Sequence, residues 1–135
     1  MNPERYVLDT SAIMTLIEDE EGSDRVDQIL RSEQVWIPWL VLLEVSYITR
    51  QERGESEADR RYALMKQLPA TISWEADEPT LLTAARIKAK YHLSLADTII
   101  ASYAIQAKAI LVHKDPDFES ISELLSTEPL PYKAL

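Results

Sequence analysis

The stretch YVLDTSAIMTLI, residues 6–17, joins a short apolar run to a helical pattern through a single acid. Tyr6-Val7-Leu8 predicts a buried strand that ends at Asp9. Thr10 and Ser11 can then cap a helix that begins at AIMTLI, residues 12–17. A strand followed directly by a helix is the repeating unit of an α/β fold, so this stretch sets the fold class that we expect.

The same alternation continues along the chain. Apolar runs predict strands at 35–37, 71–74 and 109–112, and we expect an edge strand at 128–132. One helical pattern follows Gly22, and others cover 39–54, 56–68, 77–91, 94–108 and 119–125. The segment 56–68 begins at Ser56 with the spacing of a capping box. Short apolar strands that alternate with helices predict a parallel sheet covered on both faces.

Composition favours an ordinary globular protein. The chain has 135 residues, of which 46% are hydrophobic and 27% charged, so we expect residues 1–135 to form one domain. The absence of cysteine excludes disulfides and thiolate metal sites and fits a reducing cytoplasm. The N-terminus has no apolar signal sequence, and no apolar run approaches the roughly 20 residues that span a bilayer. We therefore expect a cytoplasmic protein with no membrane partner.

The net charge of −9 argues against a basic surface that adheres to nucleic acid regardless of sequence. It does not exclude an enzyme that acts on nucleic acid. An acidic centre that binds divalent cations adds negative formal charge, which the bound metal partly cancels.

Glu44 is the one charge within the apolar stretch WLVLLEVSYI, residues 39–48. A helix can hide a glutamate by pairing it with Lys or Arg three or four positions away, but here those positions hold Leu40, Val41, Tyr47 and Ile48. Asp97 also lacks a local cation. Its neighbours at the same spacings are Leu93, Ser94, Ile100 and Ala101.

The acids fall where a parallel sheet gathers its ligands, beyond the carboxyl ends of the strands. Asp9 follows the first expected strand, and Asp115 and Asp117 follow the strand at 109–112. Glu44 lies on the second turn of a helix that follows a strand, and Asp97 lies in the first turn of its helix. We expect all of these acids to approach the same edge of the sheet.

Carboxylates that share one cleft repel each other unless they are protonated or bridged by a cation. Mg²⁺ and Mn²⁺ prefer oxygen ligands, and a carboxylate cluster that holds them can clamp a phosphodiester and activate water for attack. Two separate histidines and no cysteine do not favour zinc. The sequence therefore predicts a magnesium or manganese site formed by Asp9, Glu44, Asp97 and Asp115.

Each acid also has a simpler interpretation. Asp9 can cap a helix, Glu44 can face water, and Asp97 fits a capping box with Ser94. The DPDF segment reads equally well as a turn, 115–118. Only the joint placement of the acids favours a metal site over these separate roles. His113 is expected to be a structural hydrogen-bonding residue rather than a general base or a ligand.

Four segments together resemble the acidic motifs of PIN domains, and most closely those of the VapC-type toxins of bacterial toxin–antitoxin systems. They are VLDTSAIMTL (7–16), LLEVSYI (42–48), LSLADTIIASYA (93–104) and ILVHKDPDFES (110–120). The resemblance covers nearly the whole chain in the right order. It implies a three-layer α/β/α sandwich with a central, mostly parallel sheet.

The resemblance also implies a metal-dependent endoribonuclease that uses Mg²⁺ or Mn²⁺. The catalytic and metal-binding acids would be Asp9, Glu44, Asp97 and Asp115, with Asp117 as an additional metal ligand and Ser11 in a supporting role that orients water. An RNA substrate, an antitoxin protein and a homodimer are the partners that it implies. No substrate-binding residue can be assigned from the sequence.

One motif departs from the family pattern. The family often has Thr or Ser two residues before the last aspartate, and this chain has His113 there. Pro116 directly follows Asp115 and biases its backbone toward an extended conformation. Both Asp115 and Asp117 therefore stay open as the last metal ligand.

Two other functional classes remain as alternatives. Asp9 after a strand also suits the covalent nucleophile of an aspartyl-phosphate phosphatase or receiver domain. Against this, the residue two positions later is Ser11 rather than a second aspartate. The other alternative is a catalytically idle PIN-like module that only binds a partner protein.

Overall fold

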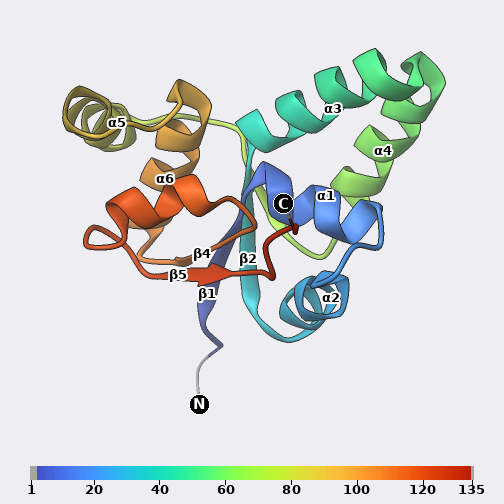
Figure 1. Ribbon diagram of the computed structural model, residues 1–135, viewed down its shortest axis with the longest axis horizontal. Helices are drawn as coiled ribbons and strands as arrows, with labels where there is room; N and C mark the ends of the chain where they lie inside the picture. The colour runs from blue at the N-terminus through green and yellow to red at the C-terminus, as the bar shows by residue number, and fades with distance from the viewer. Residues whose placement is uncertain (1–2, 135) are drawn as a thin grey trace.

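The computed structural model describes residues 3–134. In this range the chain alternates strands and helices as the sequence predicts (Figure 1). The elements are β1 (Arg5–Leu8), α1 (Thr10–Ile17), α2 (Ser23–Ser32), β2 (Gln34–Pro38), α3 (Trp39–Arg53), α4 (Glu55–Gln67), β3 (Thr71–Ser73), α5 (Glu78–Lys90), α6 (Leu95–Ala107), β4 (Ile110–His113), the 3-10 helix η1 (Pro116–Ile121) and β5 (Thr127–Pro129).

The central sheet has five strands in the order β3-β2-β1-β4-β5, and every neighbouring pair is parallel. The chain first adds β2 and β3 on one side of β1 and then crosses over to add β4 and β5 on the other. β1 therefore stands at the point where the strand order reverses. In open α/β sheets this reversal leaves a crevice at the carboxyl ends of the strands, where ligands bind.

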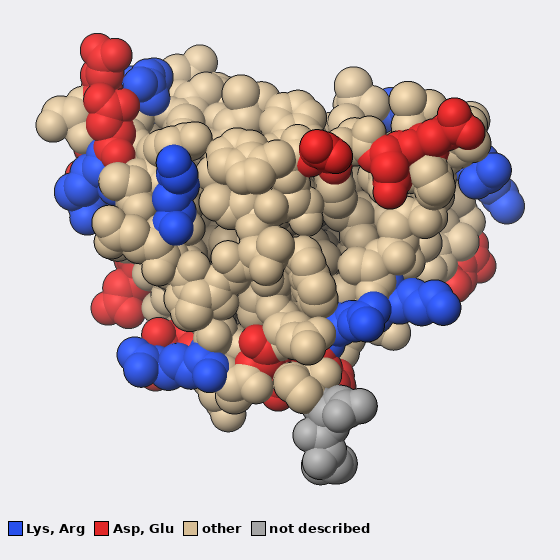
Figure 2. Space-filling view, turned by 180° about the vertical axis from the view of Figure 1, so that it is seen from behind, with Lys and Arg blue, Asp and Glu red and all other residues tan. Residues whose placement is uncertain are grey.

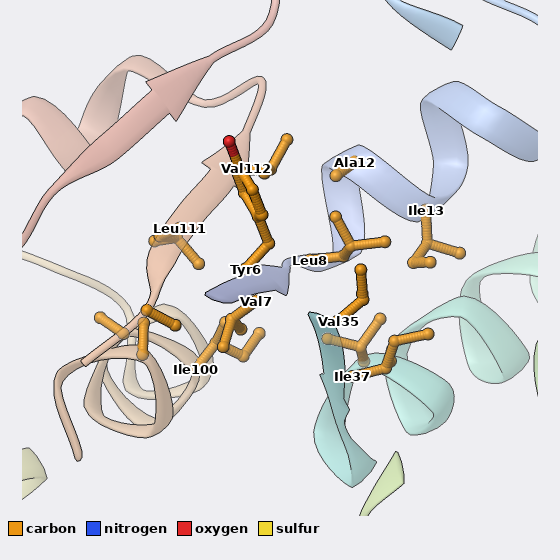
Figure 3. Close-up of a cluster of buried hydrophobic side chains, with 14 of the residues drawn as sticks. Tyr6, Val7, Leu8, Ala12, Ile13, Val35, Ile37, Ile100, Leu111 and Val112 are labelled. Carbon is orange, nitrogen blue, oxygen red and sulfur yellow. The ribbon is translucent and has the colours of Figure 1, made fainter. Parts of the chain in front are cut away.

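Helices cover both faces of the sheet, which confirms the expected three-layer α/β/α sandwich (Figure 1). Alternate side chains of β1 point to opposite layers, as the two-residue period of a strand requires. Leu8 points toward Ile13 of α1, whereas Val7 points the other way, toward Ile100 of α6 (Figure 3). All four of these side chains are fully buried, so β1 anchors both halves of the core.

Two helical hairpins, α3–α4 and α5–α6, lie on either side of the point where β1 passes into α1 (Figure 1). Gly54 both ends α3 and precedes α4, with φ 91° and ψ 174°. This conformation is essentially restricted to glycine, which explains the position of the sharp turn. The expected capping box beginning at Ser56 is wrong, because α4 already begins at Glu55 and has no side-chain cap.

Several other sequence expectations need correction. Asp9, rather than Thr10 or Ser11, caps α1. The helix expected at 119–125 is instead the 3-10 helix η1, and the last strand is three residues long. The helix expected at 77–91 is present as α5, and its Leu81 and Leu82 lie at the surface, 61% and 42% exposed. None of the helices in residues 3–134 is long and apolar enough to span a membrane.

Candidate active site

Asp9 occupies the junction between β1 and α1. Its backbone N–H donates to the carbonyl of Val112 at 3.2 Å, which fixes the end of β1 against β4. Its carboxylate caps α1, because Oδ1 accepts the N–H of Ala12 at 2.8 Å. The simpler capping role is therefore real, but it uses only part of the hydrogen-bonding capacity of this carboxylate.

The Asp9 carboxylate is buried, and within residues 3–134 no Lys or Arg forms an ion pair with it. Its residue is 2% exposed, and burial raises the pKa of its carboxyl from 3.8 to about 8. Hydrogen bonds from Ala12 and Ser11 oppose this shift, while the negative charges of Asp97 and Asp115 add to it. A cation at this point would oppose this upward shift, since it would favour the charged form of the carboxyl.

Ser11 links Asp9 to the loop after β4. Its hydroxyl lies 2.8 Å from both Oδ1 and Oδ2 of Asp9 and donates to this carboxylate. The same Oγ accepts the backbone N–H of Lys114 at 2.8 Å. Ser11 therefore joins the first and last acidic motifs of the chain.

Glu44 reaches the site from α3. Its side chain is partly buried, and its Oε1 accepts a hydrogen bond of 2.6 Å from the hydroxyl of Thr10. The neighbouring side chains Leu43 and Tyr47 are exposed, so this stretch of α3 is not buried on all sides. Glu44 thus does not simply face solvent, because a residue next to Asp9 holds its carboxylate.

Asp97 lies in the first turn of α6, where Ser94 caps the helix by accepting the Asp97 N–H at 3.1 Å. Partial burial raises the pKa of the Asp97 carboxyl from 3.8 to about 6. A hydrogen bond with Ser94 opposes the shift, and the charges of Asp115, Glu44 and Asp117 increase it. Asp97 therefore belongs to the capped first turn of its helix, and the charges of the other acids also raise the pKa of its carboxyl.

Asp115 and Asp117 lie in the turn that opens η1. Asp115 is partly buried, and its Oδ1 accepts the N–H of Asp117 at 2.9 Å, whereas Asp117 is exposed. The charge of Asp115 raises the pKa of both Asp9 and Asp97, and the charge of Asp117 contributes to the raised pKa of Asp97. Of the two alternatives for the last acid, Asp115 therefore lies closer to the centre of the group.

The five acids thus belong to one electrostatic neighbourhood rather than to separate regions. Among residues 3–134, none of them forms an ion pair with Lys or Arg, although such pairs occur elsewhere on the molecule. Carboxylates that crowd together without a cation are unfavourable in their charged form. The group therefore has both the charge and the oxygen donors that a hard divalent cation requires.

The side chains are not closed around a single point. No three Asp, Glu or His side chains in the described part of the chain are grouped tightly enough to hold a metal ion. Binding an ion would require these carboxylates to draw closer to each other. The residues fit Mg²⁺ or Mn²⁺ in their chemistry and location, since carboxylate and hydroxyl oxygens are the donors that these ions prefer.

Two supporting contacts do not follow from the sequence analysis. The first is the hydrogen bond from Thr10 to Glu44, and the second is the one from the backbone of Lys114 to Ser11. The hydroxyl pair that directly follows Asp9 is the available signal. In the sequence this pair indicates only a helix cap, because the sequence alone does not show that α3 passes close to α1.

Comparison with known families identifies the fold. The PIN domain family profile matches residues 6–124, which is most of the chain. The chain belongs to the PIN domain family. The four segments that resemble PIN motifs all lie within the matched range, and this PIN domain has the expected order of acids along its sequence. A search of curated protein sequences found no significant match.

Solved structures of VapC-type proteins share the fold of this PIN domain. VapBC2 from Rickettsia felis, bound to a promoter DNA fragment, aligns with a TM-score of 0.78 and 17% identity over 94% of this chain and 99% of that one. VapBC-1 from nontypeable Haemophilus influenzae aligns with a TM-score of 0.73 and 19% identity, covering 93% and 97% of the two chains.

A third similar structure is VapC20 from Mycobacterium tuberculosis, described as a toxin that cleaves the sarcin–ricin loop. It aligns with a TM-score of 0.69 and 14% identity over 86% of this chain and 94% of that one. At these identities the likeness establishes the architecture.

Proposed function

We propose that this PIN domain is a divalent-metal-dependent endoribonuclease and the toxin of a toxin–antitoxin pair. The observation that carries the proposal is the burial of Asp9 near Asp97 and Asp115 at the carboxyl end of the central strand, with no ion-pair partner in the described part of the chain. A buried, unpaired carboxylate is costly, and its retention indicates a use that requires a cation.

In this proposal the acids and Ser11 have different roles. Asp9, Asp97 and Asp115 would hold Mg²⁺ or Mn²⁺, with Glu44 and Asp117 at the edge of the group. When bound, the ion would supply Lewis-acid stabilisation of the phosphodiester and lower the pKa of water. Ser11 would keep the Asp9 carboxylate oriented, since its hydroxyl contacts both carboxylate oxygens.

The similar structures support the RNA substrate and the antitoxin partner. VapC20 is described as cleaving the sarcin–ricin loop, which is an RNA element, and the Rickettsia and Haemophilus proteins were solved as VapBC complexes. We extend both properties to this chain as part of the proposal. The absence of cysteine supports its placement in a reducing cytoplasm.

The aspartyl-phosphate alternative receives less support. The residue two positions after Asp9 is Ser11 rather than a second aspartate, and its hydroxyl donates to the Asp9 carboxylate. The raised pKa of Asp9 also makes it a weaker nucleophile near neutral pH, because less of the charged form is present. Membership of the PIN family adds to these arguments.

A second copy of the chain is the proposed partner for an apolar groove beside the site. Trp39, Leu81, Ala85, Leu95 and Ile99 line this groove between α3, α5 and α6. Leu81 and Leu95 are each 61% exposed, which is unusual for leucine side chains that remain in solvent. Figure 2 shows a broad central area without Lys, Arg, Asp or Glu on one face of the molecule.

The test of the nuclease proposal is cleavage of structured RNA by purified protein with and without Mn²⁺. We expect cuts that leave 5′-phosphate and 3′-hydroxyl ends, with activity lost in both Asp9→Asn and Asp97→Asn. Circular dichroism should show that both variants remain folded. Full metal-dependent cleavage by the two pure variants would refute the assignment of these acids. The absence of any Mn²⁺-dependent cut in the wild type would favour an idle binding module.

A further inference from the structure

His113 is the last residue of β4 and is held rigidly inside the protein. It is 1% exposed, and its carbonyl accepts the N–H of Leu130, just after β5, at 2.7 Å. Its ring lies against Phe118, with ring centroids 4.9 Å apart, and against Tyr132 at 6.2 Å. The imidazole is therefore fixed by β4, by η1 and by the segment that follows β5.

The ring uses this fixed position to hold the backbone of Asp115. His113 Nδ1 accepts the Asp115 N–H at 3.1 Å. No other acceptor for this N–H is found among the described residues. Because Nδ1 accepts, the proton of the neutral ring lies on Nε2. The imidazole thus acts as a fixed acceptor that points at the backbone of a proposed metal ligand.

The turn after β4 is fixed at three successive points. Ser11 accepts the N–H of Lys114, His113 accepts the N–H of Asp115, and the Asp115 carboxylate accepts the N–H of Asp117. The first contact ties the turn to Asp9, and the third orients the Asp115 side chain. The middle contact holds the backbone N–H of Asp115, and the Asp115 carbonyl accepts the N–H of Phe118 at 3.2 Å. His113 and η1 therefore fix the Asp115 backbone together.

We propose that His113 is a positioning residue, which fixes the Asp115 backbone through Nδ1 and so places the Asp115 carboxylate in the candidate metal site. This inference rests on the proposed function in so far as Asp115 is a metal ligand. Groups that orient the ligands of a metal commonly change metal affinity or activity by about 10- to 100-fold when they are removed.

Three substitutions separate this role from simple core packing. In His113→Asn, the side-chain amide oxygen can occupy a place near that of Nδ1 and accept the same N–H. In His113→Gln, the amide lies near the position of Nε2, so the acceptor is lost while a polar side chain is kept. His113→Leu removes the acceptor and keeps an apolar side chain. His92→Leu, at the other histidine of the chain, which is exposed, is the matched control.

Calorimetric titration with Mn²⁺ gives the first readout. We expect His113→Gln and His113→Leu to bind Mn²⁺ at least about tenfold more weakly than the wild type, with His113→Asn and His92→Leu within about threefold. If His113→Leu does not fold, His113→Gln decides the comparison. Equal Mn²⁺ affinities in a folded His113→Gln variant and the wild type would overturn the proposal, as would an equal loss in the Asn and Gln variants.

The second readout is independent of metal and of activity. Amide hydrogen exchange, followed by NMR without metal, should show a protected Asp115 N–H in the wild type. Exchange should be about tenfold faster in His113→Gln, whereas in His113→Asn it should be close to the wild-type rate. An unchanged Asp115 exchange rate in His113→Gln would refute the positioning role, even if the protein proved to be a nuclease. Protection that is lost only in the Gln variant would support the role even if no RNA were cleaved.

Discussion

Thr10 donates a 2.6 Å hydrogen bond to Oε1 of Glu44 and so ties the first turn of α1 to α3. Thr10 follows Asp9 directly, and Ser11 binds Asp9 on the other side of the same turn. One helical turn therefore holds two acids of the candidate site, which come from segments 35 residues apart in the sequence. This turn sets the distance between them.

Thr10→Val tests this link. The substitution keeps the branched shape and removes the hydroxyl, so Glu44 loses its partner. We expect the free energy of unfolding to fall by about 1 kcal/mol and Mn²⁺ affinity to fall about tenfold. Chemical denaturation and calorimetry would measure these quantities. Thr10→Ser retains the hydroxyl and should behave like the wild type, so equal losses in the two variants would exclude the hydrogen bond as the cause.

Asp115→Asn and Asp117→Asn distinguish the two candidates for the last ligand. Asp115 is partly buried and acts on the pKa of both Asp9 and Asp97, whereas Asp117 is exposed. We expect Asp115→Asn to lower the rate of RNA cleavage about 100-fold and Asp117→Asn to lower it less than about tenfold. Rate measurements at saturating Mn²⁺ would check this order. The reverse order would make Asp117 the main ligand.

The stability of the metal-free protein should decrease as the pH rises. Burial raises the pKa of Asp9 from 3.8 to about 8, and that of Asp97 from 3.8 to about 6. The folded state therefore binds more protons than the unfolded state at pH values between 3.8 and about 8. The stabilisation is fully present below pH 3.8 and is lost as the pH rises through about 6 for Asp97 and about 8 for Asp9.

Urea denaturation at a series of pH values between about 5 and 9, in the presence of a metal chelator, would measure this effect. We expect the Asp9 and Asp97 contributions to fall by a few kcal/mol in total over this range. Asp9→Asn removes the titrating group with the larger shift and should flatten the dependence. If the free energy of unfolding depends as steeply on pH in Asp9→Asn as in the wild type, other residues are responsible for the titration.

Mn²⁺ should stabilise the wild-type protein, and more strongly at high pH, because the metal binds the deprotonated carboxylates. At a free Mn²⁺ concentration 100 times the dissociation constant, the expected gain in unfolding free energy is about 2.7 kcal/mol. Thermal unfolding with and without Mn²⁺ would measure it. Asp97→Asn should lose most of this gain, and Ca²⁺ provides a comparison ion of the same charge. A Mn²⁺-induced rise in melting temperature that is identical in Asp97→Asn would point to a different site.

The alternation of strands and helices along the chain is predictable from the sequence, because it follows local rules. β1, β2 and β4 are short, mainly apolar runs, and parallel strands place their carboxyl ends at one edge. The same rule predicts from sequence that Asp9 and Asp115 approach each other. Ser94 caps α6 as the sequence predicts, because a cap depends only on residues within one turn.

The errors occur where distant parts of the chain decide the outcome. The sequence pattern of α5 indicates a helix, but it cannot show whether Leu81 and Leu82 pack on the same chain, and both are exposed. Ser56 has capping-box spacing, but the conformation of Gly54 starts α4 before it. The links from Thr10 to Glu44 and from His113 to Asp115 depend on the placement of one side chain, which the sequence pattern does not encode.

Anomalous X-ray scattering from crystals grown or soaked with Mn²⁺ shows directly whether the acids of the candidate site bind a metal ion. We expect an anomalous peak between the carboxylates of Asp9, Asp97 and Asp115, with oxygens of at least two of them at about 2.1 Å, the distance usual for ions of this kind. The same crystals of Asp9→Asn should show a much weaker peak or none. A fully occupied Mn²⁺ site elsewhere on the protein, with no peak between these three acids, would contradict the account.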